Sequence, residues 1–208
     1  MAAPGTGTAL YVLDIQRIMK VGLYFGSFNP VHHGHLIIAN HVVQSTELDQ
    51  VWFIVSPQNP LKPSASLLNE YHRLYLIKIA IEGENHLRAS DIEFKLPRPS
   101  YTIDTLTYLG EKYPQHEFSI IMGSDGYQNI PRWKNYEQLL KAAPFYIYIR
   151  AGYESLPEYP GARPYILDAP LLQISATHIR NILREGKSIR FLVPDVVKEE
   201  IERNRYYL

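Results

Sequence analysis

Cysteine is absent from this chain of 208 residues, so neither a disulfide nor a cysteine-ligated zinc site can form. Charge of one sign is not in excess either, because 21 basic residues (Lys and Arg) balance 21 acidic ones. A neutral chain lacks the basic excess of proteins that wrap nucleic acid, so we expect no nucleic-acid partner. No apolar run approaches the ~20 residues that span a bilayer, which predicts no membrane partner and favours a cytoplasmic protein.

Two common nucleotide-binding motifs are also missing: the chain contains neither Gly-x-Gly-x-x-Gly nor a Walker A sequence. The first 18 residues do not form a good signal peptide, since an early positive charge is lacking and Asp14 interrupts the only apolar run. We therefore expect residues 1–18 to be a tail or extension. Residues 19–208 are expected to form a single domain.

Apolar runs typical of buried strands alternate along the chain with segments of helical spacing. This alternation predicts an α/β fold with a doubly wound, mostly parallel sheet and C-terminal helices. In such sheets, ligands bind beyond the carboxyl ends of the strands. The expected strands are 20–25, 51–56, 87–94, 117–123, 145–150 and 165–170, and the expected helices are 34–48, 67–83, 101–114, 135–143, 174–186 and 194–207.

The stretch "GSFNPVHHGHL" (26–36) joins the first expected strand to the first expected helix. A helix start favours anions through its free N–H groups, and the glycines Gly26 and Gly34 allow close approach of a ligand. His32 and His35 are three residues apart, so both side chains can face one spot and donate hydrogen bonds to a phosphate. The alternatives are a metal site, although 26–46 contains no acidic residue, and a histidine-rich turn without a role.

A second stretch, "ISATHIR" (174–180), also opens a helix. Ser175 or Thr177 would cap the helix, and Arg180 follows one turn later. Two hydroxyls, free amides and an arginine make a second anion site, although the same residues also fit a purely structural cap.

Two further stretches have both a functional and a structural interpretation. In "GSDGYQNIPRW" (123–133), Asp125 follows a strand and would bind a ribose or cap a helix, while Trp133 would stack on a flat ring or fill the core. In "RPSYTIDTL" (98–106), Tyr101 and Thr102 open a helix whose free amides suit a carboxylate, or simply start that helix.

Together these stretches resemble the nucleotidyltransferase superfamily. "GSFNPVHHGHL" is similar to its Gly-x-Phe-x-Pro-x-His-x-Gly-His signature, and "ISATHIR", about 140 residues later, to its Ile-Ser-Ser-Thr-x-Ile-Arg partner. Within the superfamily, "PSYTIDTL", "GSDGYQNIPRW" and the closing "LVPDVVKEEI" resemble the bacterial nicotinate-nucleotide adenylyltransferases. The resemblance extends over residues 19–208.

The resemblance implies that ATP and nicotinate mononucleotide react, with Mg²⁺, to give deamido-NAD and pyrophosphate in NAD synthesis. The nucleophile is a phosphate that is already anionic, so no strong general base is required. Such an enzyme holds two polyanions in line and neutralises the charge that develops between them. Histidines, helix starts and an arginine suit that task, together with the Mg²⁺ that accompanies ATP.

The resemblance also implies residue roles, with no metal site built from protein ligands. The implied catalytic residues are His32, His35 and Arg180. The implied ATP-binding residues are Gly26, Ser27, Phe28, His32, His35, Gly123, Asp125, Ser175, Thr177 and Arg180. The implied mononucleotide-binding residues are Asn40, Lys62, Tyr101, Thr102, Trp133 and Lys134.

Other activities remain open at this point. A sibling adenylyltransferase would use nicotinamide mononucleotide or phosphopantetheine as the acceptor. A non-catalytic nucleotide sensor with the same fold would bind without turnover. The sequence gives no indication of the oligomeric state.

Overall fold

The computed structural model describes residues 18–58 and 67–208. Its six strands form one sheet in the order β3-β2-β1-β4-β5-β6, and every neighbouring pair is parallel. The sequence predicts a mostly parallel sheet; the observed sheet is parallel throughout. The strands are β1 (Met19–Gly26), β2 (Gln50–Val55), β3 (Leu87–Ser90), β4 (His116–Gly123), β5 (Phe145–Tyr148) and β6 (Pro164–Leu167).

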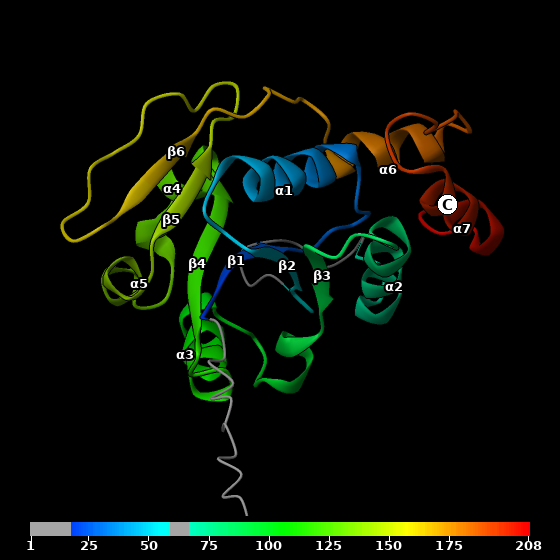
Figure 1. Cartoon of the computed structure of the whole chain (residues 1–208). Coiled ribbons are helices and arrows are strands. Elements are labelled where there is room, and N and C mark those ends of the chain that lie inside the picture. The colour runs from blue at the N-terminus through cyan, green and yellow to red at the C-terminus, as the bar shows by residue number, and fades with distance from the viewer. Residues whose placement is uncertain (1–17, 59–66) are drawn as a thin grey trace, which may run out of the picture.

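Helices cover both faces of the sheet, which explains the apolar runs in its central strands. In β2, Val51, Phe53 and Val55 face one core cluster, and the alternate residues Trp52 and Ile54 face the other. The first cluster includes residues of α1 (His33–Ser45), α2 (Glu70–Ala80), α6 (Ala176–Arg184) and α7 (Asp195–Asn204). The second includes residues of α3 (Thr102–Lys112), α4 (Ser124–Gln128) and α5 (Tyr136–Ala142) (Figure 1).

The strand order places a topological switch point between β1 and β4, which lie side by side in the sheet (Figure 1). From β1 the chain runs outward through β2 to β3, and from β4 it runs the opposite way through β5 to β6. Connections therefore diverge at the carboxyl ends of β1 and β4, and a crevice opens there. Gly26 ends β1 and Gly123 ends β4, so both expected ligand-binding stretches follow the switch point.

One expected strand differs from that observed, and two short elements are present that the sequence does not predict. The expected strand 87–94 ends at Ser90, and its second half forms the 3₁₀ turn η1 (Ile92–Lys95). The short helix α4 and the 3₁₀ turn η2 (Ile130–Arg132) are not expected from the sequence, because segments of three to five residues carry too little periodicity. The expected tail, up to residue 17, and most of the expected loop 57–66 lie outside the described residues.

Within the described ranges, no helix has the length and apolar character needed to cross a bilayer.

Candidate active site

A cavity of about 890 Å³ lies at the carboxyl ends of the strands. It brings together the two motif stretches, 26–36 and 174–180, and the two stretches with both a functional and a structural interpretation, 123–133 and 98–106. The predicted site residues that line it are Gly26, Ser27, Phe28, His32, His35, Tyr101, Thr102, Gly123, Asp125, Trp133, Lys134, Ser175, Thr177 and Arg180.

Two other predicted residues are placed differently. Asn40 lies on an exposed part of α1, accepts a hydrogen bond from Gln44 Nε2 at 3.1 Å, and is not among the cavity-lining residues. Lys62 lies outside the described residues. The helical spacing of α1 explains the position of Asn40, since it is five residues beyond His35 and therefore turned away from it.

The first motif forms the start of α1. His32 is the N-cap residue with an extended backbone, and its carbonyl accepts from His35 N at 2.9 Å. The rings of His32 and His35 stack with their centroids 3.7 Å apart. A side chain at Gly34 would lie 3.0 Å from His32 Nδ1, a tight contact that would press on the His32 ring at the helix start. No acidic residue occupies the first turn. His33 N donates to Leu192 O at 3.0 Å and His35 N to His32 O, which leaves the Gly34 N–H of this turn to an anion.

The His32 side chain is uncharged at neutral pH. Only 4 % of the residue is exposed, and burial, followed by the positive charges of Arg150 and His33, lowers the pKa of His32 to about 4. Its Nδ1 is buried without a hydrogen-bond partner. His32 therefore serves as a neutral hydrogen-bonding group, and arginine and lysine supply the positive charge of the cavity.

The second motif starts α6 and contacts the first. Ser175 is the N-cap, and its Oγ accepts from His178 N at 3.2 Å, so Ser175 and not Thr177 caps the helix. One terminal nitrogen of Arg180 donates to Asn29 O at 2.7 Å, and the other donates to Thr177 Oγ1 at 3.3 Å. Burial lowers the pKa of Arg180, but the guanidinium stays cationic at neutral pH. The two motifs thus form one electropositive wall.

Asp125 lies on the opposite wall, in the first turn of α4. Its Oδ1 is 3.8 Å from Arg150 Nε, and it does not cap the helix, which starts after Gly123 without a side-chain cap. A side chain at Gly123 would meet this carboxylate at 2.4 Å and the Arg150 side chain at 2.8 Å, so it would displace the Asp125–Arg150 pair. Sequence reasoning missed Arg150, although it follows β5 and so lies at the ligand-binding edge of a parallel sheet.

The far end of the cavity is formed by the start of α3 and the segment after η2. Tyr101 is the N-cap of α3 and Thr102 its first residue. Lys134 Nζ lies 2.8 Å from Asp104 Oδ2 and 4.8 Å from the centre of the Tyr101 ring. Trp133 lines the cavity and also packs against the second core cluster, so its functional and structural interpretations are compatible.

Three further polar side chains at the cavity were not predicted. Tyr24 Oη and Tyr148 Oη are 3.1 Å apart, and burial raises the pKa of both phenols. Glu93 is 2 % exposed and accepts from Ser100 Oγ at 2.7 Å and Thr105 Oγ1 at 2.9 Å; burial raises its pKa. All three lie in segments that the sequence predicts to be buried strands. Only the presence of a polar group in such a segment could have pointed to a role at the site.

Metal-ligating side chains do not cluster in residues 18–58 and 67–208: no group of three or more His, Asp or Glu side chains is arranged to hold an ion.

Sheet order, helix starts and cavity define an α/β protein built to bind anionic nucleotides at a switch point. The cytidylyltransferase-like family model matches residues 23–182. A relative from Cytophaga hutchinsonii, described as a probable nicotinate-nucleotide adenylyltransferase, is 51 % identical over 191 residues, which cover 91 % of this chain and 98 % of the relative. A relative from Flavobacterium johnsoniae with the same description is 48 % identical over 91 % of this chain and 99 % of its own length.

The structural comparison agrees with the sequence relatives. A Plasmodium falciparum nicotinic acid mononucleotide adenylyltransferase, solved in complex with NaAD, superposes with a TM-score of 0.77 at 20 % identity, covering 91 % of this chain and 97 % of that one. This similarity shows the shared fold. The chain belongs to the cytidylyltransferase-like family of nucleotidyltransferases and, within it, to the nicotinate-nucleotide adenylyltransferases.

Proposed function

We infer that this protein transfers the adenylyl group of ATP to nicotinate mononucleotide, which yields deamido-NAD and pyrophosphate. The observation that carries this inference is that one cavity is lined both by the starts of α1 and α6, which suit phosphates, and by the start of α3 and Trp133, which suit an aromatic carboxylate. His35 and Arg180 lie at the first end, and Thr102 and Trp133 at the second. The family membership of the chain supports the same reaction.

At the phosphate end, we propose that the start of α1 and the His35 ring hold the α-phosphate of ATP, with His32 as a neutral hydrogen-bonding neighbour. Ser175, Thr177 and Arg180 hold the β- and γ-phosphates, which leave as pyrophosphate. Fixed donors around the reacting phosphorus favour the transition state because they meet the charge that develops there without reorganising. The backbone of Gly26, Ser27 and Phe28 gives close approach to the same phosphates.

At the other end, we propose that the adenosine lies near Gly123 and Asp125 and the mononucleotide near α3. Trp133 stacks on the pyridine ring, and the free amides at Thr102 and Lys134 receive the nicotinate carboxylate. Tyr101 forms part of the same wall. Asn40 and Lys62 remain predicted contacts of the mononucleotide.

Mg²⁺ enters this proposal as part of the substrate, bound to the phosphates of ATP, where it neutralises charge. The acceptor phosphate is already anionic, so no protein group has to remove a proton from it. The protein contributes alignment of donor and acceptor, which converts a bimolecular step into one within the bound complex.

Domain boundaries and location are part of the same proposal. We propose that residues 19–208 form the nucleotidyltransferase domain, that residues 1–18 are dispensable, and that the enzyme acts in the cytoplasm. A chain that starts at Met19 is expected to fold and turn over like the full chain; loss of folding in that truncation would contradict the boundary.

The direct test is pyrophosphate release with ATP and Mg²⁺, compared between nicotinate mononucleotide, nicotinamide mononucleotide and phosphopantetheine. The proposal predicts release with the nicotinate form well above that with the other two. Release only with another acceptor would replace the acceptor assignment and leave the phosphate end intact. Binding of ATP without release for any acceptor would identify a nucleotide sensor instead.

A further inference from the structure

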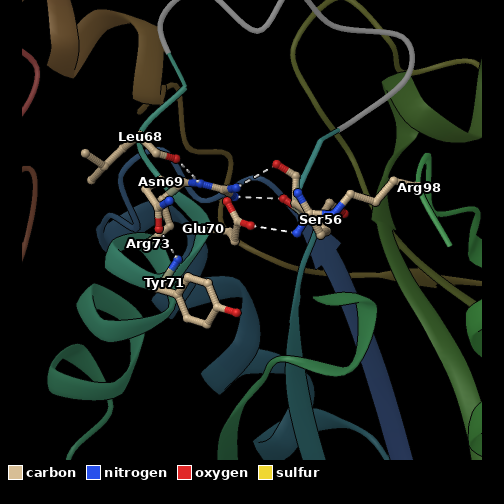
Figure 2. Close-up of polar contacts among 8 residues, drawn as sticks. Ser56, Leu68, Asn69, Glu70, Tyr71, Arg73 and Arg98 are labelled. Carbon is tan, nitrogen blue, oxygen red and sulfur yellow. Dashed lines mark hydrogen bonds and ion pairs between the residues drawn. The ribbon is translucent and has the colours of Figure 1, made fainter. Parts of the chain in front are cut away.

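Arg73 of α2 is a buried cation behind the cavity, and it is not among the cavity-lining residues. None of its surface is exposed. Burial lowers its pKa to about 10, so the guanidinium is still charged at neutral pH. The neighbouring carboxylate of Glu70 makes its ion pair with Arg98, at 2.7 Å, instead of with Arg73. Figure 2 shows the Arg73 side chain reaching past Glu70 toward Ser56.

The partners of Arg73 are backbone carbonyls from separate segments. Nε donates to Leu68 O at 2.7 Å, and one terminal nitrogen donates to both Ser27 O at 2.6 Å and Ser56 O at 2.8 Å. The other terminal nitrogen donates to Pro57 O at 2.9 Å. One guanidinium therefore ties the segment after β1 to the end of β2 and to the start of α2. A lysine, with a single nitrogen on a flexible stem, cannot reproduce this planar set of contacts.

The Ser27 carbonyl is the contact that leads to the proposed reaction centre. It precedes Phe28, a non-glycine residue in the left-handed region at φ 44°. This conformation is unfavourable for a residue with a Cβ and persists only where neighbouring contacts hold it. The Phe28 ring is 2 % exposed and packs edge-on against the His35 ring, with centroids 5.0 Å apart.

We propose that Arg73 is a positioning residue for adenylyl transfer, acting through the Ser27 carbonyl and Phe28 on the His35 ring. This inference rests on the proposed function, since it assumes that His35 holds the reacting phosphate. If Arg73 only stabilised the fold, its replacement would lower stability and leave turnover per folded molecule unchanged. A cation that sets the His35 ring changes turnover, because small displacements of a transition-state donor are costly.

The test compares Arg73→Lys with the matched control Arg98→Lys, which alters the adjacent arginine at the protein surface. Turnover is measured at a temperature where circular dichroism shows each variant to be folded. We expect kcat to fall by about 10²-fold in Arg73→Lys, while KM for both substrates stays within about threefold. Arg98→Lys is expected to match the wild type. Turnover in Arg73→Lys equal to that of Arg98→Lys would overturn the proposal.

A double-mutant cycle distinguishes a role of Arg73 in positioning the His35 ring from a role in stabilising the fold. If Arg73 acts through His35, then adding Arg73→Lys to His35→Ala lowers kcat by less than about twofold further, because the two residues act as one unit. Independent losses that multiply would overturn the proposal. An inactive wild type would instead overturn the proposed function itself, so the two failures are distinguishable.

Arg73→Met is a second variant for the case in which Arg73→Lys does not fold, because methionine places no charge in the buried position. If the lysine variant does not fold, the methionine variant is measured in the same way and the same loss of kcat is expected. If neither folds, Arg73 is a structural residue and the proposal is overturned.

Discussion

The two ends of the cavity differ in how firmly their side chains are held. At the phosphate end, His32 is 4 % exposed, Phe28 is 2 % exposed, and Arg180 is bonded across to the other motif. At the end proposed to hold the pyridine ring, which we call the pyridine end, the ion pair of Lys134 with Asp104 is open to water, with side chains 42 % and 46 % exposed. The more buried end suits transition-state stabilisation, which needs donors held in place, and the more exposed end suits admission and selection of the acceptor.

This comparison predicts separable effects. Changes at the phosphate end should alter turnover or the use of ATP, and changes at the pyridine end should alter the use of the mononucleotide. The following experiments test that division, in decreasing order of the change we expect.

The largest effect is expected for His35→Ala. Loss of one transition-state donor should lower kcat by at least ~10²-fold, with the fold unchanged by circular dichroism. KM for nicotinate mononucleotide should change little, because the pyridine end is untouched. Near-normal turnover would contradict the assignment of the phosphate end.

The second effect concerns stability and pH. The pKa of His32 is about 4 in the folded protein and near 6.5 when unfolded. Between these values the unfolded state binds the extra proton, so stability is complete above pH 6.5 and declines as the pH falls toward 4. The loss attributable to His32 is at most about 3 kcal/mol.

Urea unfolding between pH 7 and 4.5, in the wild type and in His32→Asn, measures this contribution. The wild type should lose more stability than the variant across this interval. Parallel pH dependence in the two proteins would show that His32 is not held neutral by burial.

Arg180→Gln is expected to act on ATP. Charge-assisted hydrogen bonds to phosphate contribute about 1.5–3 kcal/mol each, so KM for ATP should rise by about 10- to 10²-fold. Arg184→Gln is the matched control, because Arg184 lies one turn further along α6, exposed and outside the cavity lining. An equal effect of the two substitutions would remove the specific role of Arg180.

Trp133→Ala gives the smallest effect in this series and acts on the acceptor. Loss of ring stacking should raise KM for nicotinate mononucleotide by about tenfold, whereas KM for ATP should not change. Trp133→Phe retains a ring and should lie between the alanine variant and the wild type. A larger change in KM for ATP than for the mononucleotide would reverse the two ends.

The sequence predicts most of the fold because buried strands and amphipathic helices carry a clear period. It also predicts a hydroxyl cap at Ser175 or Thr177, and the structure has Ser175 as the cap of α6. Arg73 shows why other features of the site cannot be predicted from the sequence. Its place in a helical segment reads as an ordinary solvated arginine, yet it is buried because carbonyls up to 46 residues away converge on it. Glu93 is similar, since its partners Ser100 and Thr105 come from later segments.

In this proposal, one cavity separates the chemistry of adenylyl transfer from the choice of acceptor. The most direct test is the ratio of kcat/KM for nicotinate mononucleotide to that for nicotinamide mononucleotide, measured in the wild type and in His35→Ala. We expect a ratio well above one in the wild type and the same ratio in the variant, although both rates fall together. A wild-type ratio near one, or a ratio that changes in His35→Ala, would contradict it.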